Sequence, residues 1–263
     1  MKHAVLTIAG SDSSGGAGIQ ADLKAMSANG VFGLSVITSI TAQNTLGVSD
    51  VFHLPASIIE AQLTALFSDI PVDAVKTGML ATTAIVTTVS RILKQHNPAH
   101  LIVDPVMVAK GGQSLLEPQA ISTMKTELIP QATLLTPNIH EAEILAEKPI
   151  RTLADARTAA KIIYQLGCRH ILIKGGHLGE QPGTDLLYDG KFFRMYKGEY
   201  IETDHTHGTG CTLASAIAAQ IAKGKAIQEA VEVAKTYTTE AIRHGFPLGR
   251  GHGPTDHFYF LES

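Results

Sequence analysis

The sequence predicts an α/β domain with a mostly parallel central sheet, helices on both faces and a small antiparallel edge. Three observations lead to this fold class. Short β-branched runs recur along the chain, helical patterns separate them, and one later segment has the pattern of a hairpin. With 263 residues and 44% hydrophobic side chains, the chain is long enough to bury a full core. A single domain over residues 1–263 is therefore expected.

Six apolar runs have the length and composition of buried strands. They are AVLTIAG from Ala4, SVITSIT from Ser35, AVKTG from Ala74, HLIVDPV from His100, TLLTPN from Thr133 and HILIKGG from His170. Helical patterns lie between them, such as residues 55–69, which begin with Pro55, and residues 83–96, which have basic residues in their last turns. Strands that alternate with helices indicate a parallel sheet covered on both faces.

The last third of the chain departs from this alternation. In residues 185–196, Asp189 and Gly190 separate two strand-like runs, which predicts a hairpin at the edge of the sheet. From Cys211 onward two helices follow each other. The first ends near Gly224, and the second runs from about residue 226 to residue 244.

Composition favours small-molecule chemistry in a reducing compartment. The formal net charge is −3 and the basic residues are scattered, so the sequence offers no basic surface for nucleic acid. The first apolar run is too short for a signal peptide, and no uninterrupted apolar run is long enough to span a bilayer. We therefore expect a cytoplasmic protein with no nucleic-acid or membrane partner, in which Cys168 and Cys211 remain thiols.

Glycine and polar clusters follow each predicted strand. Ligands of open parallel sheets bind beyond the carboxyl ends of the strands. The stretches at those ends are AGSDSSGGAG, TAQN, KTGML, DPVM, TPNIHE and KGGH, which together predict a long cleft.

The first of these stretches is similar to two nucleotide-binding motifs, but its details argue against both. GAGIQA fits a dinucleotide fingerprint, but six residues separate Ala9 from Gly16, and the second strand does not end in an acidic residue. GSDSSGG also lacks the Lys and the Ser or Thr of a P-loop. A ligand-free turn remains an alternative, although the length of the stretch and its Asp12, Ser13 and Ser14 favour a binding loop.

HGTGC at residues 207–211 is the strongest local signal. Gly208 and Gly210 allow backbone N–H groups to turn toward one point, and a helix that begins near Cys211 adds the positive end of its dipole. Phosphate suits such an anion hole. The same surroundings are expected to lower the thiol pKa of Cys211 and make it a candidate base or nucleophile. Two alternatives are a small apolar plug and a hydrolase pair of Cys211 with His205 or His207.

Three charged residues stand at the same predicted edge. Lys174 stands at the end of a buried run, and a contact with phosphate would explain a cation at this position. The alternative is that its ammonium reaches into water. Asp104 and Glu141 follow adjacent strands and suit hydrated Mg²⁺, whereas Asp104 alone fits a helix cap or a loop bond equally well. An anion hole, a lysine, two acids and a proton acceptor are the set that phosphoryl transfer requires, so a kinase is favoured.

The sequence resembles the hydroxymethylpyrimidine and hydroxymethylpyrimidine-phosphate kinases of thiamine biosynthesis, in the vitamin-kinase branch of the ribokinase superfamily. The resemblance spans nearly the whole chain. It is carried by TIAGSDSSGGAGIQADLK, TAQNT, KTGML, VDPVM, TPN followed by E, KGGH, THGTGCT and the closing GHGPTDHF. It implies a ribokinase-like fold, commonly a homodimer, which uses ATP and Mg²⁺. The implied substrates are 4-amino-5-hydroxymethyl-2-methylpyrimidine and then its monophosphate, phosphorylated at one site.

The resemblance also implies residue roles. The implied anion hole consists of Gly208, Thr209, Gly210 and Cys211. The implied phosphate and nucleotide contacts are Lys174, Asn138 and Thr209, and the implied metal site consists of Asp104 and Glu141. The implied pyrimidine contacts are Ala17, Asp22, Gln43 and Met79. Most members of the wider superfamily have Asp where Cys211 stands, so the proton acceptor here departs from their pattern.

Two other functions share these residues. A pyridoxine or pyridoxal kinase is the main alternative, because similar proteins with the same cysteine phosphorylate that vitamin. Gln43 and Asn44 in TAQNT favour the thiamine pathway, since an amide pairs well with the donor and acceptor edge of an aminopyrimidine. A silent sensor of phosphorylated vitamin would not need Lys174 and Asp104, and both are present.

Overall fold

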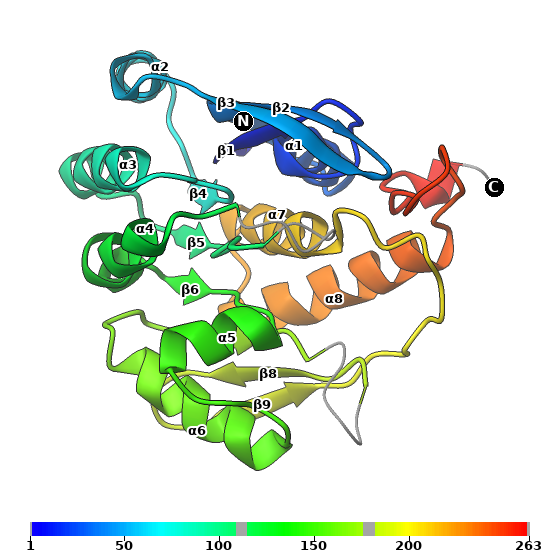
Figure 1. The fold of residues 1–263 in the computed structure, drawn as a ribbon. Helices are drawn as coiled ribbons and strands as arrows, with labels where there is room; N and C mark the ends of the chain where they lie inside the picture. The colour runs from blue at the N-terminus through cyan, green and yellow to red at the C-terminus, as the bar shows by residue number, and fades with distance from the viewer. Residues whose placement is uncertain (1, 109–114, 176–181, 262–263) are drawn as a thin grey trace.

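A nine-stranded sheet forms the centre of the computed structural model, which describes residues 2–108, 115–175 and 182–261 (Figure 1). Along the sheet the strands follow the order β3-β2-β1-β4-β5-β6-β7-β8-β9. Their bounds are β1 Ala4–Asp12, β2 Phe32–Asn44, β3 Gly47–His53, β4 Ala74–Thr77, β5 Leu101–Val103, β6 Leu134–Leu135, β7 Ile171–Ile173, β8 Asp185–Tyr188 and β9 Phe193–Tyr196.

Helices cover both faces of the sheet (Figure 1). One face carries α2 Ala56–Phe67, α3 Thr83–His96, α4 Pro118–Thr123, α5 Ile139–Ala146 and α6 Leu153–Tyr164. The other face carries α1 Gly18–Ala28, α7 Thr209–Ala222 and α8 Ile227–Arg243. A π-helical turn at Met124–Leu128 and short 3-10 turns at Ile129–Gln131 and Tyr259–Leu261 complete the helical segments of the described chain.

The period of two along each strand explains this layering. In β1, Leu6 and Ile8 pack into the first core, while Val5, which directly precedes Leu6, packs with α7 and α8 in the second. All three are fully buried. A strand buried on both faces needs an uninterrupted apolar run, which is the pattern that the sequence shows.

The predicted fold class is confirmed. Strands β2, β1, β4, β5, β6 and β7 pair in parallel. The predicted hairpin is β8 and β9, antiparallel to each other and placed at the edge beside β7. Its turn residue Gly190 has a φ of 91°, a left-handed conformation that glycine adopts without strain.

A second antiparallel edge was not predicted. The sequence analysis places TAQN after the second strand, but β2 continues through these residues to Asn44 and pairs with β3. Asn44 stands opposite Gly47, which leaves a two-residue turn, and the Asn44 side chain accepts a hydrogen bond from the N–H of Leu46 at 2.8 Å. This pair of strands is half exposed, so it lacks the apolar run that indicates buried strands. Gln43 is consequently held on a strand rather than on a loop.

The two predicted C-terminal helices are α7 and α8, and α7 begins two residues before Cys211. Both cysteines are free thiols, and Cys168 is buried, with a thiol pKa that burial raises to about 12. Within the described ranges, the helices are all too short or too polar to cross a membrane.

Candidate active site

A cavity of about 270 Å³ lies at the carboxyl edge of the parallel strands. It is lined by the loops after β1, β4, β5, β6 and β7, the end of β2 and the turn that precedes α7. Among the predicted site residues, the cavity brings together Gln43, Met79, Asp104, Asn138, Glu141, Lys174, Gly208, Thr209, Gly210 and Cys211. In the KGGH stretch, residues 176 and 177 lie outside the described residues.

A second cavity of about 390 Å³ adjoins the first. Its other walls come from residues 183–203 and from the α7 and α8 helices. The residues that line both cavities are Asn138, Lys174, Thr206, Thr209 and Gly210. Two ligands, one in each cavity, would therefore meet at the start of α7 and at the Lys174 ammonium.

The turn before α7 has the geometry of an anion-binding site. Gly208 has a φ of 82°, and a Cβ on it would lie 1.8 Å from the carbonyl oxygen of Gly16, so only glycine fits. A Cβ on Gly210 would lie 3.3 Å from Lys174 Nζ, which places the ammonium against the first turn of α7. The first N–H groups of a helix lack acceptors within the helix, and its dipole is positive there. An anion bound at this point would contact both the N–H groups at the start of α7 and the Lys174 ammonium.

Lys174 is paired with Asp104 across the cavity. Its Nζ lies 2.7 Å from Asp104 Oδ1, and the two side chains are 15% and 2% exposed. Burial alone would lower the pKa of Lys174, but the carboxylates of Asp104 and Glu141 raise it above its ordinary value. Lys174 therefore remains a cation inside the site and does not reach into water as an exposed side chain.

Glu141 closes a capping box at the start of α5. Its carboxylate accepts from the N–H of Asn138 at 2.8 Å, and Asn138 Oδ1 accepts from the N–H of Glu141 at 2.9 Å. Burial, the larger cause, and the Asp104 carboxylate together raise the pKa of Glu141 to about 7 against the opposing effect of Lys174. Two buried carboxylates that face one cavity suit Mg²⁺, which binds few protein oxygens and keeps several waters. Among the described residues, no group of three or more His, Cys, Asp or Glu side chains is placed to hold a metal ion.

The thiol of Cys211 differs from its prediction. Burial raises its pKa to about 11, and the Asp22 and Asp104 carboxylates raise it as well, whereas the Lys76 ammonium lowers it. The expectation of a lowered pKa is therefore wrong. A helix start is visible in the sequence, but the desolvation and the two carboxylates that outweigh it come from distant parts of the chain. Cys211 is a neutral thiol in the free protein at neutral pH.

Neither Asp22 nor Ala17 lines either of the two cavities. The Asp22 carboxylate is fully buried beneath the site, 2.7 and 2.8 Å from Lys76 Nζ. It also accepts from the hydroxyls of Thr7 at 2.6 Å and Ser215 at 2.7 Å. Asp22 thus joins β1, β4, α1 and α7, and Ala17 precedes the first residue of α1. The sequence analysis missed Lys76, although a lysine within an apolar strand indicates a buried partner.

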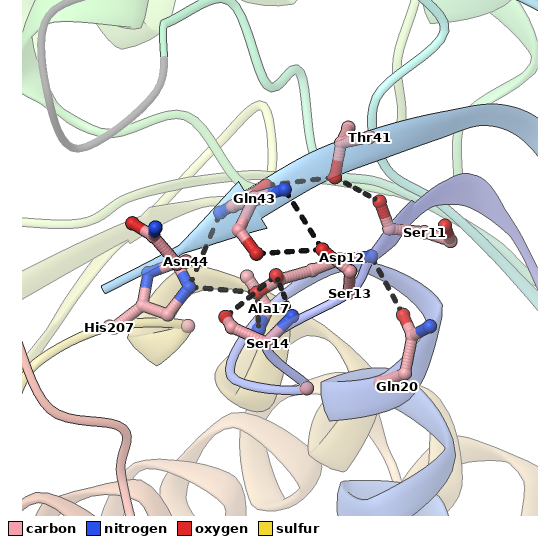
Figure 2. A network of polar contacts seen from close by, with 12 residues as sticks. Ser11, Asp12, Ser13, Ser14, Ala17, Gln20, Thr41, Gln43, Asn44 and His207 are labelled. Atoms are coloured by element: carbon pink, nitrogen blue, oxygen red, sulfur yellow. Dashed lines mark hydrogen bonds and ion pairs between the residues drawn. The ribbon is translucent and has the colours of Figure 1, made fainter. Parts of the chain in front are cut away.

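Figure 2 shows the polar network around Gln43, which lines the first cavity. His207 Nε2 lies 2.8 Å from Asp12 Oδ2 and 3.4 Å from the Gln43 amide nitrogen. Burial acts to raise the pKa of Asp12, but hydrogen bonds from His207 and Ser14 lower it to about 2. Asp12 therefore engages the His207 imidazole, and this geometry does not support a Cys-His hydrolase. The sequence singles out both residues but contains no signal that pairs them.

Comparison with known proteins agrees with this geometry. A family model described as phosphomethylpyrimidine kinase matches residues 12–256. The chain belongs to this family. The hydroxymethylpyrimidine/phosphomethylpyrimidine kinase of Bacillus subtilis is 48% identical over 262 residues, which cover 99% of this chain and 97% of that protein.

Solved structures include both vitamin kinases. The phosphomethylpyrimidine kinase of Clostridium difficile 630 is 48% identical with a TM-score of 0.83, and the match covers 92% of this chain and all of the other. The pyridoxal kinase of Bacillus subtilis, solved as an ADP complex, is 40% identical with a TM-score of 0.93 over the whole of both chains. The predicted family and the ribokinase-like fold are therefore confirmed.

Proposed function

We propose that this chain transfers a phosphoryl group from ATP to the hydroxymethyl group of 4-amino-5-hydroxymethyl-2-methylpyrimidine, and then phosphorylates the monophosphate to the diphosphate. These are phosphorylation steps of thiamine biosynthesis, the pathway that is named for related bifunctional proteins of Geobacter sulfurreducens and Oryza sativa. The observation that carries the proposal is the meeting of two cavities at Lys174 and the first turn of α7. Phosphoryl transfer needs a donor site and an acceptor site in line, with positive groups between them.

Each cavity is suited to one substrate. The pyrimidine would occupy the first cavity, where the Gln43 amide contacts the ring edge and Met79 packs near the ring. ATP would occupy the second cavity, with its phosphates against Asn138 and Thr209 and with Lys174 at the γ-phosphate. For the second transfer, the phosphate of the monophosphate would take the place that the hydroxyl held in the first.

Asp104 and Glu141 would hold Mg²⁺ through their carboxylates and its waters. When bound, the ion would neutralise negative charge on the phosphates. Lys174 would then be shared between Asp104 and the transferring group, because both lie within reach of its ammonium. The N–H groups of Gly210 and Cys211 would orient the same group without reorganisation, whereas that of Thr209 donates to the carbonyl of Thr206 at 3.4 Å.

Cys211 would face the substrate hydroxyl as a thiol. A loose transition state needs little activation of the nucleophile until late in the transfer, so orientation and charge neutralisation contribute most. Because the raised pKa leaves Cys211 as a neutral thiol, it cannot take up the hydroxyl's proton; its sulfur would orient the hydroxyl as a weak hydrogen-bond acceptor, and the proton would pass late to an oxygen of the transferred phosphoryl group.

The chain would act in the cytoplasm as a single domain over residues 1–263 and as a homodimer. For the dimer, the exposed apolar side chains of the β2 and β3 edge offer a surface: Ile40 and Phe52, cross-strand neighbours, are 49% and 63% exposed. Sedimentation of the purified chain, with Phe52→Lys as the comparison, would measure this. A wild-type chain that sediments as a monomer would contradict it.

Phosphorylation of pyridoxine or pyridoxal is the second candidate function, because the structure of the Bacillus subtilis pyridoxal kinase aligns with this chain over the full length of both. The two functions share the phosphoryl-transfer residues and differ in the acceptor that the first cavity prefers.

The deciding experiment follows ADP release by the purified protein with Mg²⁺ and ATP. Hydroxymethylpyrimidine, its monophosphate and pyridoxine are supplied separately, and a Lys174→Ala variant serves as the inactive control. Turnover of both pyrimidines, with pyridoxine much weaker, supports the proposal. Faster turnover of pyridoxine with an inert pyrimidine monophosphate would leave the fold and the transfer site in place but overturn the substrate assignment.

A further inference from the structure

The closing motif GHGPTDHF has no part in the function described so far. Its residues lie beside the turn that carries the anion-binding N–H groups. The N–H of His207 donates to the carbonyl of Gly253 at 3.1 Å, and the N–H of Thr255 donates to the carbonyl of His207 at 3.4 Å. Between them, Pro254 pairs with His207 in a parallel bridge. Both backbone polar groups of His207 are thus bonded to the C-terminal segment.

A side-chain relay extends this contact to Gly208. His257 is buried, and its Nε2 lies 2.9 Å from the hydroxyl of Thr212. That hydroxyl donates to the carbonyl of Gly208 at 2.9 Å. A threonine hydroxyl has one proton, so His257 must donate from Nε2. Burial and the Lys24 ammonium lower the pKa of His257 to about 4, so the ring is neutral at neutral pH, and the hydrogen bonds of the Thr212 hydroxyl assign its single ring proton to Nε2.

The segment is itself fixed at both ends. The Tyr237 hydroxyl on α8 donates to the carbonyl of His257 at 2.9 Å. At the other end, the N–H of His252 donates to the carbonyl of Thr45 at 3.1 Å, directly after β2. A Cβ on Gly251 would lie 2.0 Å from that same carbonyl oxygen, so the two backbones are in close contact. Figure 1 shows the C-terminal segment beside the end of α8 and the hairpin of β2 and β3.

We propose that residues 251–257 form a brace that positions the phosphate-binding turn, acting on Gly208 through His257 and Thr212. The brace touches neither cavity, so its residues are positioning residues. Gly208 stands where the chain enters α7 in a left-handed conformation, and its carbonyl orientation determines where the following N–H groups point. Preorganised N–H groups stabilise developing charge only when they are held at the correct angle. This inference depends on the anion-binding role of the turn proposed above.

The test compares variants of the Thr212 hydroxyl in the full-length protein. Thr212→Val removes the hydroxyl at nearly constant volume, and Thr212→Ser retains it. The matched control is Thr158→Val on α6, because Thr158 makes the same kind of bond to the carbonyl four residues earlier, Ala154, at 3.0 Å and outside both cavities. We expect Thr212→Val to lower kcat by about tenfold with the KM of the acceptor unchanged, since a misplaced transfer geometry affects the chemical step. Thr212→Ser should restore most of the turnover, and Thr158→Val should match the wild type.

A second pair of variants covers a loss of folding. If Thr212→Val does not fold, His257→Gln, which keeps a hydrogen-bond donor, is compared with His257→Leu, which has none. His257→Gln should then have the higher kcat. Activities are normalised to the folded fraction measured by circular dichroism. Equal kcat per folded molecule in all variants would show that the segment contributes only to stability, and it would overturn the proposal. The wild type is assayed first with each acceptor, so a failure of the proposed substrate is seen separately from a failure of the brace.

Discussion

The buried pair of Asp22 and Lys76 allows a quantitative prediction. Both side chains are fully buried, the charged atoms are 2.7 and 2.8 Å apart, and Thr7 and Ser215 donate to the same carboxylate. Burial alone would lower the pKa of Lys76, but Asp22 raises it above its ordinary value, so Lys76 remains a cation. Removing one member of such a pair leaves an unpaired buried charge and costs roughly 3–5 kcal/mol. We therefore expect Asp22→Asn and Lys76→Met each to lower the free energy of unfolding by that amount.

Urea unfolding at pH 7 measures the effect in a double-mutant cycle. The double variant should lose less than the sum of the single variants, by about 2 kcal/mol, because it leaves neither charge unpaired. The surface pair of Arg91 and Glu60 is the control. Its charged atoms are also 2.7 Å apart, but the side chains are 45% and 46% exposed. Arg91→Met should cost less than about 1 kcal/mol, since water screens the pair.

The same variants distinguish a structural Asp22 from a ligand contact. Below its unfolding transition, Asp22→Asn should keep the KM for the pyrimidine within about twofold of the wild type, because Asp22 lies outside both cavities. A tenfold higher KM with an unchanged free energy of unfolding would refute this reasoning. Asp22 would then be the substrate contact that the family resemblance implies.

Three further predictions concern the site and its support. Lys174→Ala should lower kcat by about 10²- to 10³-fold. Cys211→Ala should lower kcat by only about tenfold, since a thiol pKa of about 11 leaves little thiolate at pH 7. Equal losses of kcat in steady-state assays would contradict this ranking of the two residues. Gln43→Met should raise the KM of hydroxymethylpyrimidine about tenfold and leave that of pyridoxine nearly unchanged, and parallel changes would mean that Gln43 does not select the acceptor. The pKa of His257 falls from 6.5 to about 4 on folding, so the unfolded chain binds more protons between these values. His257 should therefore lower the free energy of unfolding by about 3 kcal/mol from pH 6.5 to pH 4, and this contribution is measured as the difference between the wild type and His257→Leu, because the raised pKa of Glu141 acts in the opposite direction in both proteins.

The Asp12 and His207 pair shows where reading the sequence reaches its limit. Asp12 is recognisable as part of a polar loop, and His207 as part of a glycine-rich turn. Their contact joins residues that are 195 positions apart, and only the folded sheet brings the two loops to one edge. The second antiparallel edge was missed for a related reason. Half-exposed strands such as β3 have little apolar periodicity, so their pairing depends on the neighbouring strand.

The sequence by itself determined the parallel part of the sheet, the family, the strand-end residues such as Lys174 and Asp104, and the glycine turn at Gly208. Strand runs, helix periods and glycine turns are local signals, and the family motifs are continuous stretches of the chain. Only the tertiary structure decided that Asp22 is buried against Lys76, 54 residues away, and that Cys211 is a neutral thiol. Burial and the charges around a group depend on which distant segments pack against it, and desolvation can outweigh the effect of a helix terminus.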